Sequence, residues 1–429
     1  MKTHDIWIQK GFRRTGEIFG VIVFALVGFT QMAYAAIANQ PAKAYVSNFK
    51  DNTVSVINTE TGTVVATVPV TAGPHGMVVS PDGSTVYVSG DGGSTISVIE
   101  TATDRVAQTI EVGKTLNGLA MRPDGKLLLA TVYGEDRVAF VDTSTRAVIG
   151  TVPMPKPHAI SIRPDGQVAY VASQEPGKFA LGVIDLSERT VLRMVPLEKT
   201  PRDVEFGYDG KNLYFTLAGV NAIEVLDPMS DRIVKEIPTG ASPHIAGYYR
   251  GSTVGVGVVQ GPGELLLFDP MTNTALRSVA VGKQPHWVAT TSDGKKAYVT
   301  NEGANSVTVV DLASGQTSTI AVGSAPRKVV VQPIAATTAK REAKVSISNF
   351  TFVPAEITVA RGETVVWSND DGAPHGLEYN DGAKGTDLLL PGQTFSRRFD
   401  RSGTYDYNCS VHPYMTGRVI VRDDVAAGR

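Results

Sequence analysis

The sequence contains a single cysteine, Cys409, among its 429 residues. One cysteine cannot form an internal disulfide, so the thiol is idle, bridges to another chain or binds a metal. The chain also lacks a basic excess, because 40 Lys and Arg face 42 Asp and Glu, and we expect no nucleic-acid partner. Long helical patterns are few, whereas 43 glycines and 24 prolines favour a turn-rich, all-β protein.

The first 35 residues have the features of an export signal. Its positively charged start is made by Lys2, Lys10, Arg13 and Arg14. A mostly apolar run over 18–29 follows, and the Ala-Tyr-Ala sequence at 33–35 fits a small-residue cleavage site. The run is short for a membrane span, and an uncleaved anchor is the alternative. We therefore predict a cleaved signal peptide at 1–35, a periplasmic location and no stable membrane insertion after cleavage.

A unit of just over forty residues repeats along most of the remaining chain. Each copy combines a Pro-His-type turn, an apolar run, a turn that is usually Asp-Gly, and two further apolar runs. The position after the turn proline, which is replaced by Leu116 in the second copy, is occupied in successive copies by His75, Asn117, His158, Arg202, His244, His286 and Arg327. These positions are spaced by 42, 41, 44, 42, 42 and 41 residues. The period is that of a four-stranded propeller blade of about 40–45 residues.

The two ends of the repeat region predict how it closes. It begins in the middle of a unit, at Ala44–Asn48, and ends with only an opening strand, Arg327–Val331. Six complete units and these two fragments make seven blades, and the last strand would pair with the first three. Closure of this kind removes exposed sheet edges. We predict a seven-bladed β-propeller over 36–333.

Two short phrases of this region resemble a known family. Tyr45-Val46-Ser47-Asn48 and Tyr298-Val299-Thr300-Asn301 are similar to the signature of the YVTN family of β-propellers, and so are the phrases that begin at Asn52 and Asn305. The resemblance covers about residues 44–333. It implies the propeller fold and says little about function, because propellers host many activities.

A second, smaller domain follows the repeats. Residues 334–342 are rich in Ala and Thr and are predicted to be a linker. Strand-like segments resume in 343–429, where we expect a small β-sandwich. They are Val345–Ile347, Glu356–Val359, Thr364–Trp367, Phe395–Phe399, Thr404–Tyr407 and Arg418–Val421.

The lone cysteine lies in this second domain, within a pattern typical of a copper site. Cys409, His412 and Met415 have the spacing Cys-x-x-His-x-x-Met, and His375 is the only other histidine after residue 342. Two imidazoles, one thiolate and one long thioether contact describe a blue-copper electron-transfer site. We predict one copper bound by these four residues.

The same region resembles the cupredoxins, and amicyanin most closely, over about 343–422. The short loop from Cys409 to Met415, the preceding Gly403–Tyr407 and the order of Trp367, Asn369, Pro374 and His375 carry the resemblance. It implies that Asn369 braces the copper loop and protects the sulfur, with an ordinary turn residue as the alternative. It also implies that His375 is buried, that His412 is the electron port, and that a redox partner docks on a patch around Pro413 and Tyr414, with Pro374 and Pro391 adding to it.

Every histidine between the signal and this domain falls on one repeat position. His75, His158, His244 and His286 are predicted to lie with Arg202 and Arg327 at one mouth of the propeller channel. The simpler interpretation is a repeated Pro-His turn whose imidazole bonds to a neighbouring backbone. The alternative is a second metal or an anion bound at the channel axis.

The leading hypothesis is an exported single-electron carrier whose propeller docks or positions it, so an electron carrier is favoured over a catalyst. One alternative is a periplasmic redox enzyme with a second centre, a metal or an anion, at the histidine ring. Another is a copper-handling or scaffold protein whose propeller binds a further protein.

Overall fold

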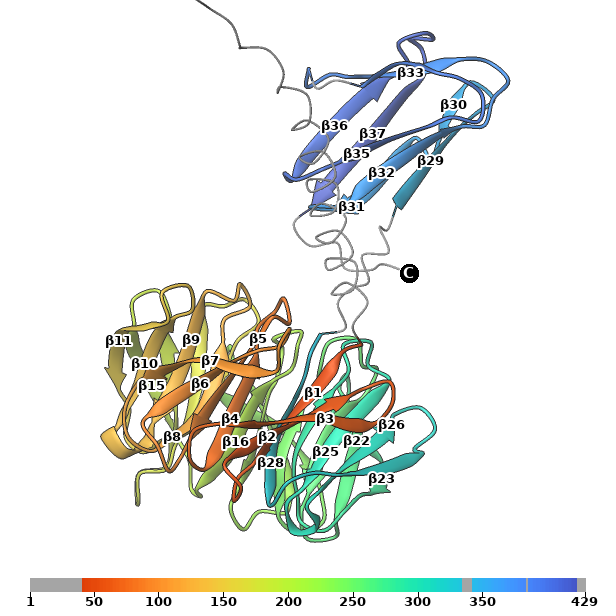
Figure 1. The fold of residues 1–429 in the computed structure, drawn as a ribbon. Helices are drawn as coiled ribbons and strands as arrows, with labels where there is room; N and C mark the ends of the chain where they lie inside the picture. The colour runs from red at the N-terminus through yellow and green to blue at the C-terminus, as the bar shows by residue number, and fades with distance from the viewer. Residues whose placement is uncertain (1–40, 334–341, 383–384, 423–429) are drawn as a thin grey trace, which may run out of the picture. The chain divides into compact units, whose positions relative to one another are not determined.

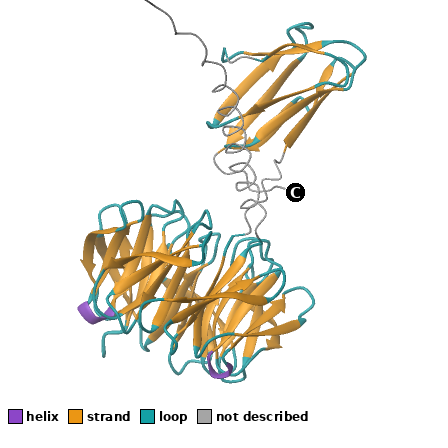
Figure 2. Cartoon of the chain, in the orientation of Figure 1, coloured by secondary structure: helices purple, strands orange, loops and turns teal. Residues whose placement is uncertain are grey.

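The computed structural model of the chain describes residues 41–333, 342–382 and 385–422. The chain divides into two compact units, Met1–Ala335 and Ala336–Arg429. Strands make up almost all the secondary structure in both units (Figure 1, Figure 2). The described helices are the short 3₁₀ turns η1 (Tyr133–Glu135) and η2 (Glu302–Ala304).

Two sequence predictions fall largely on residues outside the described ranges. The signal peptide at 1–35 lies there, as does the linker except for Glu342, and both stay predictions. Within the described residues, no helix has the length and apolar character needed to cross a membrane.

The first unit consists of seven four-stranded antiparallel sheets, which confirms the predicted propeller. The first strands of the seven sheets are β28 (Pro326–Val331), β4 (Pro74–Val79), β8 (Leu116–Met121), β12 (Pro157–Ile162), β16 (Pro201–Phe206), β20 (Pro243–Gly247) and β24 (Pro285–Thr290). The second strands are β1 (Lys43–Asn48), β5 (Thr85–Gly90), β9 (Leu127–Val132), β13 (Val168–Ser173), β17 (Leu213–Leu217), β21 (Gly255–Val259) and β25 (Lys296–Asn301).

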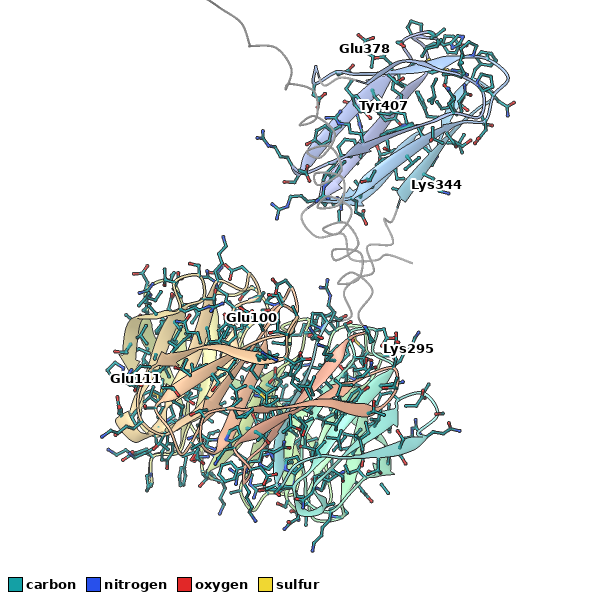
Figure 3. The ribbon with its side chains drawn as sticks, viewed as in Figure 1. Glu100, Glu111, Lys295, Lys344, Glu378 and Tyr407 are labelled. Carbon is teal, nitrogen blue, oxygen red and sulfur yellow. The ribbon has the colours of Figure 1, made fainter. Side chains whose placement is uncertain are left out.

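The outer half of each sheet contains one buried and one exposed strand. The third strands are β2 (Thr53–Asn58), β6 (Thr95–Glu100), β10 (Arg137–Asp142), β14 (Ala180–Asp185), β18 (Ala222–Asp227), β22 (Glu264–Asp269) and β26 (Ser306–Asp311). The fourth are β3 (Thr63–Pro69), β7 (Arg105–Glu111), β11 (Ala147–Pro153), β15 (Thr190–Pro196), β19 (Arg232–Pro238), β23 (Thr274–Ala280) and β27 (Thr317–Ala321). Charged side chains such as Glu100, Glu111 and Lys295 are exposed on this unit (Figure 3).

The first strands form a closed ring around the propeller axis. Each lies beside the first strand of the next sheet, in the order β28, β4, β8, β12, β16, β20, β24 and back to β28. The closing sheet joins the two ends of the repeat region, since Val46 of β1 pairs with Val329 of β28. Gln332 extends this pairing with a backbone N–H bond to the Lys43 carbonyl of 2.8 Å. The predicted closure is therefore confirmed.

A repeated tyrosine contact ties one blade to the next. Tyr45 and Tyr170 are buried in second strands, and their hydroxyls donate to Asp104 and Asp231 in the following blade at 2.7 and 2.6 Å. These acceptors have positive φ values near 50°, a conformation that Asp and Asn adopt more readily than most residues. One turn residue thus shapes its own hairpin and satisfies a buried hydroxyl of its neighbour.

The second unit is a sandwich of two mixed sheets, in agreement with the predicted cupredoxin fold. One sheet has the order β30 (Thr351–Val353), β29 (Glu342–Ser348), β32 (Thr364–Asn369) and β35 (Thr394–Arg398). The other has the order β31 (Glu356–Ala360), β37 (Thr416–Arg422), β36 (Gly403–Asn408), β33 (His375–Tyr379) and β34 (Thr386–Leu389). Trp367 and Tyr407 meet in the core, with ring centres 5.4 Å apart. Tyr407 marks this core in Figure 3. The short strands β30, β33 and β34 were not predicted.

Ring closure leads to a stability prediction. Val329→Ala removes two buried methyl groups from the strand that joins the two ends of the repeat region, and Val329 is fully buried. We expect the free energy of unfolding of the propeller to fall by about 2 kcal/mol. Calorimetry of the full chain measures this from the propeller transition. The control is Val65→Ala, on the exposed strand β3, which should change stability by less than about 0.5 kcal/mol. Equal effects of the two variants would contradict the closure argument.

Candidate metal centre

The hairpin of β36 and β37 positions three of the four predicted copper ligands. Cys409 directly follows β36 and Met415 directly precedes β37, and the neighbouring residues Asn408 and Thr416 pair across the two strands. The backbone N–H of Cys409 donates to the Met415 carbonyl at 3.0 Å, and that of Met415 to the His412 carbonyl at 2.9 Å. These bonds fold the seven-residue loop into a tight turn, so the sheet determines where its side chains project.

The fourth predicted ligand arrives from a different strand of the same sheet. His375 is the first residue of β33, and its Nδ1 lies 3.6 Å from the Cys409 Sγ and 3.3 Å from the His412 Nδ1. The Cys409 Sγ is 3.7 Å from the His412 Nδ1. A search of the described His, Cys, Asp and Glu residues for three ligand atoms within 4.8 Å of one another finds these three residues.

These three separations fit one metal ion. A point equidistant from the three atoms in their plane lies about 2.0 Å from each, close to the usual metal–nitrogen and metal–sulfur bond lengths. A thiolate with two imidazoles suits copper in both of its common oxidation states. Met415 is buried beside them in the same hydrophobic cluster as Cys409. The residues present therefore fit a copper ion.

The cysteine sulfur is enclosed by protein. Cys409 is fully buried, and its sulfur accepts the backbone N–H groups of His412 at 3.3 Å and Gly376 at 3.4 Å. Hydrogen bonds from backbone groups stabilise negative charge on a sulfur atom. His412 is only partly buried, whereas His375 is completely buried. Of the two imidazoles, His412 is therefore the one that reaches the surface.

Asp371 orients the buried histidine, and sequence reasoning missed it. Its Oδ2 lies 3.0 Å from the His375 Nε2, so the imidazole holds its proton on Nε2 and directs the Nδ1 lone pair toward Cys409. The backbone N–H groups of Asn349 and Phe350 also donate to this carboxylate, at 2.6 and 2.9 Å. Although burial opposes them, these donors hold the pKa of Asp371 below its ordinary value. A carboxylate four residues before a ligating histidine was the signal available in the sequence.

Phe350 was also missed, because it comes from a distant hairpin. Its ring centre is 5.4 Å from that of His375 and 5.0 Å from that of His412, in edge-to-face contacts. Asn349 and Phe350 both have positive φ, near 50°, in the turn between β29 and β30. The hydrogen bonds to Asp371 hold this turn in place, so the carboxylate positions both the imidazole and the aromatic ring. No local sequence signal identified Phe350.

Asn369 is buried, and its described hydrogen bonds differ from the prediction. Its side-chain amide donates to the carbonyls of Ala373 at 2.8 Å and Leu389 at 2.7 Å, and its oxygen accepts the backbone N–H of Asp371. These bonds brace the loop that leads to His375, where we had expected them on the loop that carries Cys409. The described donors to the sulfur are the backbone groups of Gly376 and His412.

Comparison with known proteins agrees with this geometry. The family model of copper-binding proteins of the plastocyanin/azurin family matches residues 339–422. Amicyanin of Paracoccus versutus is 34% identical over 96 residues, which are 21% of this chain and 73% of that protein. Through this domain, the chain belongs to the cupredoxins. Plastocyanin of Scenedesmus fuscus is 36% identical over 84 residues, 17% of this chain and 86% of that protein. The second unit of this cupredoxin-bearing chain is thus a copper electron-transfer module.

The propeller has its own relatives. A YNCE-like β-propeller model matches residues 23–123. Two solved structures share the fold. Hydrazine synthase of Kuenenia stuttgartiensis has a TM-score of 0.51 and 24% identity, and the match covers 56% of this chain and 77% of that one. Dihydro-heme d1 dehydrogenase NirN has a TM-score of 0.52 and 16% identity, and the match covers 69% of this chain and 76% of that one. At these identities the likeness concerns the fold alone.

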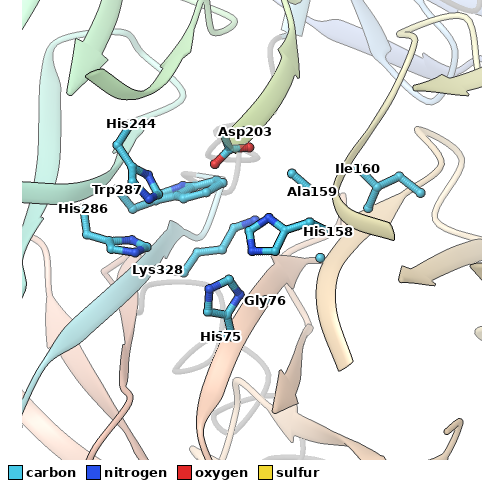
Figure 4. Close-up of a pocket in the computed structure, with 11 residues that line it drawn as sticks. His75, Gly76, His158, Ala159, Ile160, Asp203, His244, His286, Trp287 and Lys328 are labelled. Carbon is cyan, nitrogen blue, oxygen red and sulfur yellow. The ribbon is translucent and has the colours of Figure 1, made fainter. Parts of the chain in front are cut away.

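The four propeller histidines gather around the channel, each as the second residue of a first strand (Figure 4). Ring centres are 4.1 Å apart for His244 and His286, 6.2 Å for His286 and His75, and 5.5 Å for His75 and His158. Burial lowers the pKa of every one of them, that of His158 to about 4 and that of His244 to about 3. The four imidazoles are therefore neutral at pH 7.

Arg202 and Arg327 are the second residues of β16 and β28, the position that the histidines occupy in their own first strands. Burial is the main cause that lowers the four histidine pKa values, and the positive charge of Arg327 adds to it at each of them. Eleven of the described residues line the small cavity beside the imidazoles, and neither arginine is among them. The Arg327 guanidinium stacks 3.4 Å from the Phe49 ring centre, and its Nε lies 3.3 Å from Glu302. Arg202 donates to the Ser242 hydroxyl at 2.7 Å. Partners on the neighbouring loops account for both orientations.

The contacts of Asn369 predict a structural variant effect. Asn369→Ala removes both donors from the buried carbonyls of Ala373 and Leu389, so we expect the cupredoxin unit to lose about 1–3 kcal/mol of stability. Thermal unfolding of the copper-loaded chain, followed by the loss of copper colour, measures this. Asn380→Ala, at an exposed position, is the control and should leave the transition unchanged. An unaltered transition in Asn369→Ala would show that the loop needs no such brace.

Proposed function

We propose that this chain is an exported electron carrier in which His375, Cys409, His412 and Met415 hold one copper ion. The observation that carries the proposal is the triangle formed by the Cys409 sulfur and the two Nδ1 atoms, with side lengths of 3.3, 3.6 and 3.7 Å. When bound, the copper supplies a reversible one-electron change between Cu(I) and Cu(II). No bond to another molecule forms or breaks in this function.

The residues of the chain hold the donor atoms in place while the electron moves. Asp371 keeps the proton of His375 on Nε2, and the Cys409–Met415 loop is fixed by backbone hydrogen bonds. The two N–H groups that reach the sulfur stabilise it as a thiolate. Because these groups are set by the fold before any partner arrives, little of the site has to rearrange when one electron is gained or lost.

The surface around His412 supports docking of a redox protein. Exposed apolar side chains surround this imidazole: Tyr414 is 71% exposed, Val411 43% and Phe350 41%. Pro413, Pro374 and Pro391 are exposed as well. We define the His412 patch as Phe350, Val411, His412, Pro413 and Tyr414. An apolar surface beside an accessible ligand lets a partner approach the metal closely and exclude water.

The location and the role of the propeller belong to the same proposal. The positively charged start and apolar run of residues 1–35 support export to the periplasm. The seven closed blades of the propeller offer a rigid platform. We therefore propose that the propeller docks to another protein and in this way positions the cupredoxin unit.

The ligand assignment predicts a spectroscopic outcome. Cys409→Ser removes the thiolate, so the intense visible absorption of the copper-loaded protein and its narrow copper hyperfine splitting should both disappear. Met415→Leu is the companion variant, since it replaces the thioether with a hydrocarbon of similar shape. It should keep the colour and raise the reduction potential, because the axial ligand tunes that potential. Persistence of the colour in Cys409→Ser would refute the assignment.

The docking proposal predicts a kinetic effect without a shift in potential. Two copies that exchange electrons must bring their His412 patches together, so Tyr414→Ala should lower the electron self-exchange rate about tenfold, equivalent to about 1.4 kcal/mol of lost contact. Line broadening in mixtures of oxidised and reduced protein measures this rate. Met229→Ala removes an exposed apolar side chain from the propeller and should have no effect. Equal rates in wild type and Tyr414→Ala would locate the port elsewhere.

A further inference from the structure

The propeller channel contains a large cavity at the end opposite the histidines. The histidines are second residues of first strands, whereas this cavity is lined by six of those strands from their third residue onward and by the turn that follows β20. Its volume is about 510 Å³. Sites for small molecules in proteins typically measure about 300–1,000 Å³. The cavity beside the histidines has a volume of about 20 Å³, which leaves room for little more than one water molecule.

The large cavity has a polar floor and an apolar wall. Ile160, Trp287 and Lys328 line both cavities and therefore form the floor between them (Figure 4). The Lys328 ammonium lies 3.9 Å from the centre of the Trp287 ring, so it occupies one face of that ring. Apolar side chains of five blades contribute to the wall: Val78, Met121, Ile162, Ala289 and Val330. An organic molecule with an apolar body fits these surroundings.

Three charged residues line this cavity, and two of them compensate each other. They are Glu205, Arg250 and Lys328. The Lys328 ammonium interacts with the carboxyl group of Glu205 and also with that of Asp203. Burial raises the pKa of Glu205 to about 7, although Lys328 and a hydrogen bond with Ser161 oppose the rise. The floor of the cavity therefore carries little net charge.

Arg250 is the charge that has no counterpart. It is exposed at the rim, and no hydrogen bond or ion pair of its guanidinium is found among the described residues. Arg250-Gly251 replaces the Asp-Gly turn that five other units have at this end of the channel. An arginine of another blade shows the contrast, because Arg163 pairs with its own turn residue Asp165 at 2.7 Å. One blade thus exchanges a turn carboxylate for an unpaired cation that faces the cavity.

The donors of the cavity select the kind of anion. A guanidinium donates two parallel hydrogen bonds to a carboxylate, and one unbalanced cation matches one negative charge. The neighbouring Tyr249 also lines the cavity, and burial raises the pKa of its hydroxyl well above the ordinary value. Tyr249 therefore keeps its proton and offers a further donor. An amine is disfavoured, because Lys328 already covers the Trp287 ring and would repel a second ammonium group.

We propose that this cavity binds a small organic acid with one carboxylate and an apolar body. The carboxylate pairs with Arg250 at the rim, and the body lies against the wall above Trp287 and Lys328. None of the copper ligands takes part, so the inference does not depend on the electron-carrier proposal.

The test compares three probes of one shape and different charge by isothermal titration calorimetry of the copper-loaded full-length chain. The probes are phenylbutyrate, phenylbutanol and phenylbutylamine. We expect one phenylbutyrate per chain, and binding of the alcohol and the amine that is weaker by about tenfold or more, because each lacks the charge-assisted bonds to Arg250.

Two variants and a matched control locate the site. Arg250→Ala should weaken phenylbutyrate about tenfold and leave phenylbutanol unchanged, because only the carboxylate uses the guanidinium. Arg163→Ala removes the same charge from the same end of the channel, but from a paired arginine, and should change binding by less than about twofold. Ala289→Phe places a ring inside the cavity and should weaken the acid and the alcohol alike.

The unfolding transition of the propeller shows which variants are folded. If Ala289→Phe fails to fold, Arg250→Ala still decides, since its side chain is exposed and unpaired. Absence of phenylbutyrate binding at millimolar concentration overturns the inference, and so does equal binding of the acid and the amine. Undiminished binding in Arg250→Ala overturns it as well. The copper colour is measured in the same samples, so loss of the colour would refute the electron-carrier proposal alone.

Discussion

One backbone hydrogen bond, from the Cys409 N–H to the Met415 carbonyl, determines the geometry of the copper site. It closes the loop between β36 and β37, so the side chains of Cys409, His412 and Met415 leave a single tight turn. The hairpin strands carry this turn, and their register places Asn408 opposite Thr416 at its base. The sheet therefore holds the two ends of the loop, Cys409 and Met415, next to each other, and His412 lies between them on the same turn.

The remaining ligand depends on a second set of contacts, centred on Asp371. This carboxylate accepts from the His375 Nε2 and from two backbone N–H groups of the β29–β30 turn. One side chain therefore connects the buried imidazole with the turn that places Phe350 against both histidines. The two sheets of the sandwich each contribute to the site through this link. Such outer contacts orient ligating histidines and adjust the electron density that they offer to a metal.

Much of the fold and of the metal centre could be predicted from the sequence, for identifiable reasons. The propeller was predictable because the repeat begins and ends in the middle of a unit, at Ala44–Asn48 and Arg327–Val331, which implies the observed closure. The copper residues were predictable because a lone Cys409 with His412 and Met415 at fixed spacing has few other uses. Phe350 was not, because its approach depends on two residues with positive φ. The side-chain partners of Arg202 and Arg327, Ser242 and Glu302, were not predictable either, because those residues are distant in sequence.

The central claim is that one sulfur and two nitrogens of this chain surround a single copper ion in the cupredoxin unit. X-ray absorption at the copper edge of protein loaded with one equivalent of copper tests it most directly. The account predicts a first shell of one short copper–sulfur bond and two copper–nitrogen bonds of about 2.0 Å, the distance that the His375, Cys409 and His412 donor atoms allow. A first shell of nitrogen and oxygen only, without the short sulfur bond, would contradict it.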